Sequence, residues 1–168
     1  MKAYDALTPV CQFNTLAGFP QEYRHIEDDS VQFQMNQIIQ EEFDELLDAF
    51  QAVNRGEVID GAGDLIVTAA GLLHRMGLDP NDVMAAINAS NQSKFCHTAH
   101  DAYESVCQYD DDPRYHSVKA ELVDDLYYVI YGKKPGSDSW KILKGINYFE
   151  PDFSALKGFK DQPQKRGV

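Results

Sequence analysis

Two long helical patterns, separated by a short polar break, constrain this chain more than any other feature. Apolar residues recur at helical spacing over residues 31–53 and again over 57–76. Ser30 is placed to cap the first segment, and Gly56 to end it. The second segment contains the run GAGDLIVTAAGLL, which is apolar or small around most of its circumference, so it has to pack closely against other helices. The sequence predicts a helical bundle at the centre of the fold.

Two shorter helices are expected to complete this bundle. Thr8-Pro9 is a capping residue followed by a proline, which is typical of a helix start, and this helix would stop at Gly18. Asp79-Pro80 repeats the signal for a further helix through NDVMAAINASNQSKF. Three or four helices joined by short turns make a bundle-like unit. We therefore expect a core domain over residues 1–96.

The remainder of the chain, residues 97–168, changes character. A polar stretch with room for one short helix leads to two β-prone runs, 127–131 and 140–143, around a Pro-Gly-Ser-Asp turn. This pattern predicts a β-hairpin followed by an extended tail. A lone hairpin is marginal in water, so it should pack on the core or on a neighbouring subunit. The expected fold is mainly α, with a four-helix-type core and a C-terminal hairpin extension.

The bulk properties exclude several classes of protein. The 168-residue chain carries 27 acidic against 15 basic residues, a net charge of −12, which disfavours a nucleic-acid polymer as partner. No apolar run reaches the ~18 residues that span a bilayer, and no signal-peptide pattern opens the sequence. The three scattered cysteines form no CxxC pair, so neither a disulfide framework nor a thiolate zinc site is indicated. We expect a cytoplasmic protein, in the host cytoplasm if it is phage-encoded, without a membrane partner.

Acidic residues interrupt the apolar face of the first long helix. At about 100° per residue, Asp44 and Asp48 lie opposite the apolar arc, where water reaches them. Glu42 falls inside the arc, Glu45 on its edge and Glu41 one step further out. Two neighbouring carboxylates cannot both stay ionised on a packed face unless bases or a cation compensate them. Glu42 and Glu45 are therefore candidate site residues.

The second long helix offers matching carboxylates. Asp60 and Asp64 lie one turn apart on one side, and the small residues 61–63 allow another helix to approach. Carboxylates converging from two helices suit a hard, oxygen-seeking cation, so Mg²⁺ or Mn²⁺ is the expected cofactor. The alternative is that both acidic helices only present solvated faces, which is common for such sequences.

A polar stripe follows on the next helix. Asn88, Asn91 and Lys94 recur at intervals of three residues. Two amides and a cation near a bound divalent ion would hold a polyphosphate. Taken alone, however, the stripe is better explained as a helix C-terminus with a cation favoured by the helix dipole.

The order of these motifs resembles the MazG-like superfamily of all-α nucleoside triphosphate pyrophosphohydrolases. EEFDE, residues 41–45, matches the EExxE motif; the segment beginning DGAGD stands where the family has ExxD; NASNQSKF resembles the segment that closes the four-helix core. The resemblance covers residues ~8–96, and the C-terminal segment WKILKGINYFEPDF looks like the end of phage and bacterial members that resemble phosphoribosyl-ATP hydrolases. It implies hydrolysis of a (d)NTP to (d)NMP and pyrophosphate with Mg²⁺ or Mn²⁺, in homodimers or homotetramers with sites between subunits.

The resemblance also assigns roles to residues. Position by position it implies metal-binding or catalytic roles for the acids of both motifs and phosphate contacts for the stripe: Glu41, Glu42, Glu45 and Asp64, then Asn91 and Lys94. The family's ExxD glutamate would fall at Gly61, so Asp60 is interpreted as its substitute one residue earlier. In the implied mechanism, Glu41 or Glu45 accepts the proton of the attacking water.

Base selection rests on fewer residues. Phe13 and Asn14 offer a stacking surface and an amide, the pair that reads a base edge, although a core Phe and a surface Asn explain them equally. Because phage members of the superfamily include enzymes for dGTP and GTP, a guanine nucleotide is the first expected substrate. Phosphoribosyl-ATP and pyrimidine dNTPs are alternatives within the superfamily.

Two readings from other classes stay open. A di-iron carboxylate protein needs Glu-x-x-His on two helices, and the chain offers one such sequence, Glu22 to His25, in a loop-like stretch. A non-enzymatic acidic helical interaction module is the other. The inward placement of Glu42 argues against that module.

Overall fold

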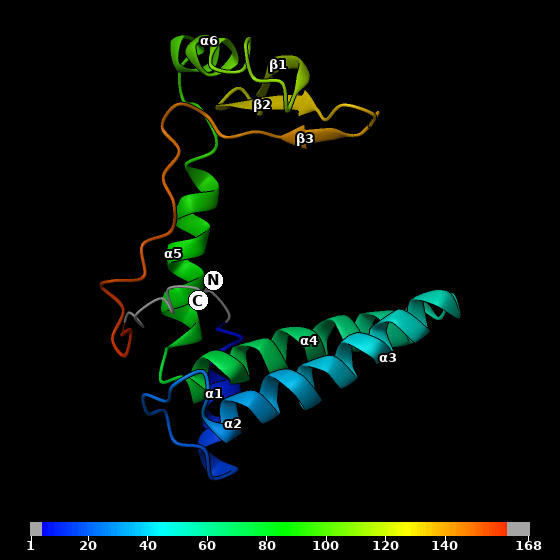
Figure 1. Cartoon of the computed structure of the whole chain (residues 1–168), viewed down its shortest axis with the longest axis vertical. Coiled ribbons are helices and arrows are strands. Elements are labelled where there is room, and N and C mark those ends of the chain that lie inside the picture. The colour runs from blue at the N-terminus through cyan, green and yellow to red at the C-terminus, as the bar shows by residue number, and fades with distance from the viewer. Residues whose placement is uncertain (1–4, 161–168) are drawn as a thin grey trace, which may run out of the picture. The chain divides into compact units, whose positions relative to one another are not determined.

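The fold, obtained as a computed structural model, is described for residues 5–160 and is mainly helical (Figure 1). The helices are α1 (Thr8–Leu16), α2 (Asp29–Phe33), the π-helix η1 (Gln34–Ile39), α3 (Gln40–Gln51), α4 (Arg55–Arg75), α5 (Pro80–Gln92) and α6 (Ala99–Cys107). The strands are β1 (His116–Val123), β2 (Tyr127–Lys133) and β3 (Trp140–Ile142). No described helix combines the length and the apolar character that crossing a bilayer requires. The cytoplasmic location stays a prediction.

The chain divides into two compact units. Within the described residues, the first contains 5–84 together with 153–160, and the second is Ala85–Asp152. The expected domains, 1–96 and 97–168, stay a prediction, as does the packing of the extension. Because α5 begins in the first unit and ends in the second, its place in a four-helix core also stays a prediction.

The first long helix has two irregularities that its sequence pattern does not reveal. It forms as α2, η1 and α3 in succession, so a π-helical segment lies inside the expected helix. Its cap is Asp28, not Ser30 as expected. The Asp28 carboxylate accepts hydrogen bonds from the Ser30 backbone N–H (2.9 Å) and hydroxyl (2.5 Å). A carboxylate two residues upstream satisfies the open N–H groups, which leaves Ser30 inside the first turn.

The turn between α3 and α4 also differs from the expectation. Gly56 does not end the first helix but lies in the first turn of α4. The Asn54 side chain accepts hydrogen bonds from the N–H groups of Gly56 (3.2 Å) and Glu57 (3.4 Å). Val53 adopts a positive φ of 55° to complete the tight reversal. The strong cap at Asn54 therefore sets the start of α4.

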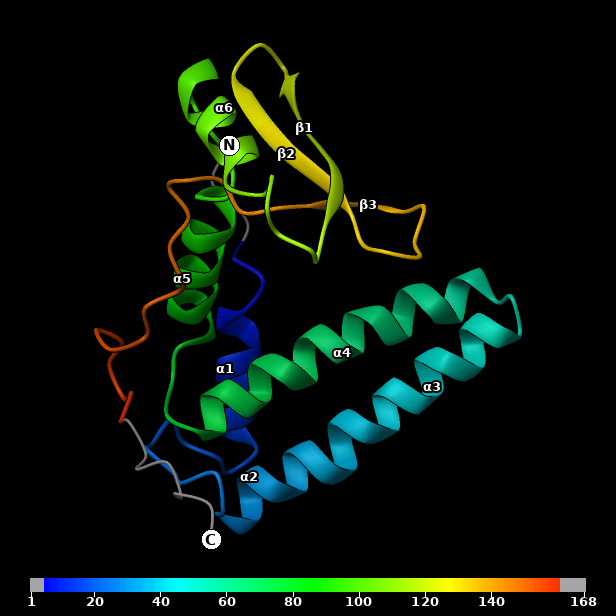
Figure 2. The same ribbon diagram turned by 45° about the horizontal axis from the view of Figure 1, so that its top comes forward.

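Helices α3 and α4 run side by side as an antiparallel pair, with α1 packed on α4 (Figures 1 and 2). The two helices approach closely at Gly61, where a Cβ would stand 3.3 Å from the Cα of Leu46. Buried amides bridge the other end of the pair, where Gln34 Nε2 donates to the Thr68 carbonyl (2.9 Å). The expectation that small residues on the second long helix allow a close neighbour is confirmed at Gly61.

The second unit is built around an antiparallel sheet of order β1-β2-β3. The expected hairpin is confirmed as β2 and β3, with Tyr131 opposite Ile142. Strand β1 was not predicted, although residues 117–122 alternate between polar and apolar, because this segment follows a polar stretch and only the two later runs were interpreted as β-prone. The core of this unit consists of buried side chains from α6, the sheet and their connections: Cys96, Ala102, Ile130 and Leu143.

Candidate active site between α3 and α4

A pocket of about 360 Å³ lies between α3 and α4, in the half of the pair nearest the 52–54 turn. Five carboxylates line it, together with small residues and the capping asparagine. The lining residues are Glu45, Asp48, Ala49, Ala52, Asn54, Glu57, Asp60, Gly61 and Asp64. The pocket is thus the meeting place of the acids of the two long helices.

Helical spacing explains why these carboxylates meet. Glu45 and Asp48 are three residues apart on α3, and Asp60 and Asp64 are one turn apart on α4, so each pair shares a helix face. The tight turn at residues 52–54 then brings the two faces together. Ala49 and Gly61 leave room between them because neither has a side chain longer than a methyl group.

None of the five pocket carboxylates has an ion-pair or side-chain hydrogen-bond partner among residues 5–160. Their mutual repulsion is therefore uncompensated by the described part of the chain. Such a pocket attracts cations. Among the same residues, no group of three or more His, Cys, Asp or Glu side chains is arranged to hold a metal ion by itself.

Glu42 lies beside this pocket and responds to its charge. Its side chain is half-buried, unlike the exposed Glu41 and Glu45. The pKa of Glu42 is raised, first by desolvation and then by the negative charges of Asp64, Glu45, Glu41 and Asp60. The prediction that Glu42 lies on the packed side is confirmed, and its electrostatic neighbours include both aspartates of α4.

The structure corrects the expected division of the acids. Asp48 was predicted to face only solvent, but it is exposed and also lines the pocket with Glu45. Glu45 was predicted to point toward the acids of the facing helix; it is exposed, and it lines the pocket with Asp60 and Asp64. Asp44 is the ordinary surface acid: it is exposed and accepts a hydrogen bond from Gln40 Nε2 (2.9 Å).

Glu57 is a lining residue that the sequence analysis missed. It lies three residues before Asp60, so helical spacing alone places it on the same face. The expected segment 57–76 already contained Glu57, so its spacing to Asp60 was a signal that could have identified it.

The substitution at the ExxD motif has a geometric explanation. Gly61 is buried against the backbone of Leu46, while Asp60 is exposed and lines the pocket. A glutamate at position 61 would have to separate the helices, whereas Asp60 reaches the pocket without a clash. The role of Asp60 as the substitute ligand stays a prediction.

The polar stripe belongs to the second unit. Lys94 Nζ donates to Asn91 Oδ1 (2.8 Å), and Asn88 is exposed. Since these residues and the carboxylates lie in different units, the predicted phosphate contacts with Asn88, Asn91 and Lys94 stay a prediction.

Phe13 and Asn14 do not share a surface. Phe13 is 68% exposed, whereas Asn14 is 7% exposed and donates from Nδ2 to the Val10 carbonyl (3.0 Å). Asn14 also lies at the closest approach of α1 to Gly71 of α4, where a Cβ would meet its amide at 3.3 Å. The structure thus places Phe13 at the surface and Asn14 in the interior, which is the opposite of the alternative that Phe13 is a core residue and Asn14 a surface residue. Their role in base recognition stays a prediction.

Comparison with known proteins gives a match over this part of the chain. Residues 17–91 match the phosphoribosyl-ATP pyrophosphohydrolase family. The matched segment contains all five pocket carboxylates and Glu42. The match agrees with the resemblance to the MazG-like all-α pyrophosphohydrolases. It does not show whether the chain is a phage-type member, which stays a prediction.

Two further comparisons, with curated proteins and with solved structures, add to this match. An uncharacterized protein of Acanthamoeba polyphaga mimivirus is 34% identical over 84 residues, which are 48% of this chain and 32% of the relative. The chain thus spans about a third of the length of the curated relative that it matches. No solved structure matches the chain.

Proposed function

We propose that the chain is a metal-dependent nucleotide pyrophosphohydrolase, which releases pyrophosphate from its substrate at the pocket between α3 and α4. One observation carries this proposal: five carboxylates without partners among the described residues line a single pocket inside the segment that matches a pyrophosphohydrolase family. The raised pKa of Glu42 beside that pocket also favours a functional site over a non-enzymatic acidic module, since perturbed carboxyl groups gather at functional sites.

The donor set of the pocket fits Mg²⁺ or Mn²⁺. Carboxylate oxygens are the hard ligands that these ions prefer, and Mg²⁺ is commonly held by one or two carboxylates together with substrate phosphates and water. A cluster of three protein ligands is therefore not needed. Asp64 and Glu45 are the proposed main ligands, with Asp60 and Glu42 as neighbours that add negative charge.

The chain's own residues supply proton transfer and positioning. A water attacks the α-phosphorus, the bond from that phosphorus to the α–β bridging oxygen breaks, and pyrophosphate leaves with the bond electrons. Glu41 or Glu45 accepts the proton of the water. A divalent cation held by Asp64 and Glu45 would supply positive charge to neutralise the phosphates and to lower the pKa of the attacking water.

The first proposed substrate is a (d)NTP, with dGTP and GTP ahead of the others, converted to the monophosphate. Phosphoribosyl-ATP is the second candidate, and the family match favours it. In both cases the leaving group is pyrophosphate, so the same pocket serves either substrate.

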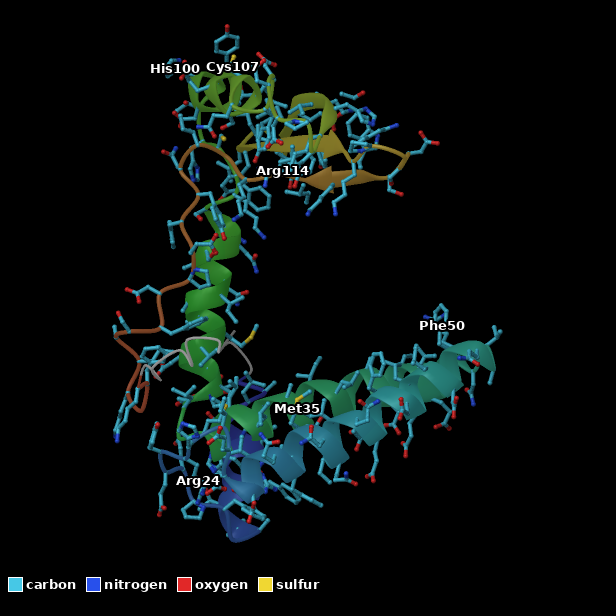
Figure 3. The ribbon with its side chains drawn as sticks, in the orientation of Figure 1. Arg24, Met35, Phe50, His100, Cys107 and Arg114 are labelled. Atoms are coloured by element: carbon cyan, nitrogen blue, oxygen red, sulfur yellow. The ribbon has the colours of Figure 1, made fainter. Side chains whose placement is uncertain are left out.

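An exposed apolar surface supports a homo-oligomer. Met35, Phe43 and Phe50 of the long helix are 48%, 46% and 71% exposed, and Ile66 of α4 is 62% exposed. Figure 3 shows Met35 and Phe50 on the same side of the helix pair. Since exposed apolar surface of this extent marks contact sites, we propose a second copy of the chain as its partner.

The test is product analysis. The protein is incubated with each common dNTP and NTP and with phosphoribosyl-ATP, with Mn²⁺, Mg²⁺ or EDTA, and the products are separated by ion exchange. The expected result is pyrophosphate plus a monophosphate product, with metal only. Diphosphate or nucleoside products, or full activity in EDTA, contradict the proposal.

Variants assign the reaction to the pocket. Glu45→Gln and Asp64→Asn, which each remove a proposed ligand, should each abolish metal-dependent pyrophosphate release, and Glu42→Gln, which removes a neighbouring negative charge, should weaken it. Asp44→Asn is the matched control, because it removes an exposed acid of the same helix that does not line the pocket. Iron in the purified protein without nucleotide hydrolysis would instead indicate the di-iron reading.

A further inference from the structure

The second unit contains a pocket of opposite charge to that of the candidate active site. It has a volume of about 420 Å³, and four cationic side chains line it together with two tyrosines and an apolar strand end. The lining residues are Lys94, Tyr109, Arg114, Tyr115, Lys141, Ile142, Leu143 and Lys144. In a chain of net charge −12, a pocket with four cations is a marked local reversal. Figure 3 shows Arg114 in this unit, just before β1.

Nearby carboxylates compensate this charge only in part. Asp112 holds Arg114 through hydrogen bonds from Nε to both carboxylate oxygens (2.9 and 3.2 Å) and from Nη2 (2.7 Å). Glu150 holds Lys144 at 2.8 Å. These carboxylates raise the pKa of both bases, which stay protonated at neutral pH.

The other two cations form no ion pair with a carboxylate within residues 5–160, although Glu150 lies near enough to Lys94 for their charges to interact. Lys94 Nζ donates to the neutral amide oxygen of Asn91 (2.8 Å). Within residues 5–160, the ammonium group of Lys141 has neither a hydrogen-bond nor an ion-pair partner. Four cations set against two carboxylates leave two positive charges for an incoming anion.

Backbone contacts hold the walls of this pocket together. The Tyr109 hydroxyl donates to the Lys144 carbonyl (3.0 Å) and accepts from the Lys144 N–H (3.1 Å). The Gly145 N–H donates to the Lys94 carbonyl (3.0 Å). Leu143, between the two lysines of this strand end, is buried in the core. The cations therefore project from a fixed frame, which reduces the entropy lost on binding.

Two aromatic rings form part of the wall. Tyr109 and Tyr115 pack edge to face with centroids 5.5 Å apart, and the Arg114 guanidinium lies 5.8 Å from the Tyr115 ring. Aromatic and guanidinium planes beside cations suit a ligand that carries a planar ring and a phosphate. The pocket volume is within the range of small-molecule sites.

We propose that this pocket is a second ligand site, which binds a nucleoside monophosphate through its phosphate and ring. Lys141 and Arg114 contact the phosphate, and Tyr115 contacts the ring. Because cationic side chains supply the charge, binding needs no divalent cation. The proposal is independent of the function proposed for the carboxylate pocket.

The test measures binding of GMP and of inorganic phosphate to the full chain by calorimetry in EDTA, at low salt. GMP should bind at least tenfold more tightly than phosphate. Lys141→Gln should weaken both ligands about tenfold, since one charge-assisted hydrogen bond is lost. Tyr115→Leu, which keeps apolar bulk, should remove most of the advantage of GMP over phosphate.

Two controls separate the sites. Lys134→Gln removes an exposed lysine of the same unit that does not line the pocket, and it should leave GMP affinity unchanged. Asp64→Asn should also leave it unchanged, which separates this site from the metal-dependent one. Absence of GMP binding by a folded wild-type chain, or equal effects of Lys141→Gln and Lys134→Gln, would overturn the proposal, whichever way the hydrolysis assay turns out.

Discussion

The backbone of Gly77, just after α4, lies directly against that of Gly158, in the segment near the end of the described chain. A Cβ on Gly158 would overlap the carbonyl oxygen of Gly77, and Gly158 has a φ of +92°. On its other side, Gly77 lies against the backbone of the 22–23 loop, where a Cβ would stand 2.6 Å from Tyr23 N. The Lys160 ammonium lies 4.2 Å from the Tyr23 ring centre. Three segments that are distant in sequence thus meet through two glycines.

Gly158→Ala should release residues 153–160 from the first unit. The added methyl overlaps backbone that cannot rotate away, and the left-handed conformation costs an L-residue about 1–2 kcal/mol. Hydrogen exchange of the amides in 153–160, measured by mass spectrometry, should become about tenfold faster, while α4 stays protected.

Gly136→Ala provides the control for backbone strain alone. Gly136 also has a positive φ, of +77°, but nothing lies within 4 Å of its Cβ position. The Gly136→Ala variant should leave the hydrogen exchange of the amides in 153–160 unaltered. Equal protection of 153–160 in wild type and Gly158→Ala would show that the close contact does not hold this segment.

Gly61 and Gly63 give a second matched pair, on α4. Gly61→Ala places a methyl 3.3 Å from the backbone and Cβ of Leu46, so α3 and α4 have to move apart; we expect a loss of about 1–2 kcal/mol in the free energy of unfolding. Gly63→Ala has open space and should stabilise by about 0.5–1 kcal/mol, because alanine is the better helix former. Chemical denaturation of both variants measures the difference.

Gly61→Glu extends this prediction to the site. It places the family's glutamate at its usual position, but the close contact with Leu46 should separate the helices and lower both stability and pyrophosphate release. Higher activity than wild type would show that position 61 does reach the pocket, and that Asp60 is not its substitute.

Periodic apolar patterns predicted the long helices well, because they depend on local spacing. Helix α4 begins two residues before and ends one residue before the expected 57–76 segment. The π-helical segment at 34–39 leaves no mark on the pattern. The start of α4 was misplaced because both Asn54 and Gly56 are plausible end signals, and the choice depends on which side-chain hydrogen bond forms.

The candidate site was predicted only in part, since a helical wheel fixes directions on one helix but not the angle between two. Asp48 lies opposite the apolar arc, yet the tight turn brings α4 close enough for it to face Asp60 across a pocket. The cationic pocket could not be predicted from the sequence. Lys94, Arg114 and Lys141 meet through the pairing of β1, β2 and β3, and β1 was not predicted.

Substitutions at Phe13 and Asn14 distinguish a role in base recognition from a role in packing. Phe13→Ala should leave the melting temperature within about 1 °C of wild type, because the ring is 68% exposed, and it should raise KM if the ring stacks on a base. Asn14→Ala should destabilise by about 1–3 kcal/mol, since it removes a buried hydrogen-bonding amide beside Gly71. Thermal unfolding together with KM for the best substrate measures both. An unchanged KM in Phe13→Ala would exclude a stacking role.

Glu42 links the charge of the pocket to stability. Its pKa in the folded chain is raised by desolvation and by Asp64, so folding favours its protonated form. The stability that this group contributes is fully present below its unfolded pKa of about 4.3 and is lost as pH rises through the raised folded pKa. A glutamine at this position cannot ionise, so the Glu42→Gln variant does not lose this stability as pH rises. In EDTA at pH 8, its melting temperature should exceed that of wild type by about 2 °C.

The difference in melting temperature between Glu42→Gln and wild type should shrink as pH falls and vanish well below about 4.3, where the wild-type carboxyl is protonated in both states. Asp44→Asn should show no such rise at pH 8, because Asp44 is exposed and lies outside the pocket. Mn²⁺ should stabilise wild type more at pH 8 than at pH 5, since the cation binds ionised carboxylates, and should stabilise Glu42→Gln less. A Glu42→Gln variant that melts below wild type at pH 8 in EDTA would show that this carboxylate is stabilised by a partner and not repelled by Asp64.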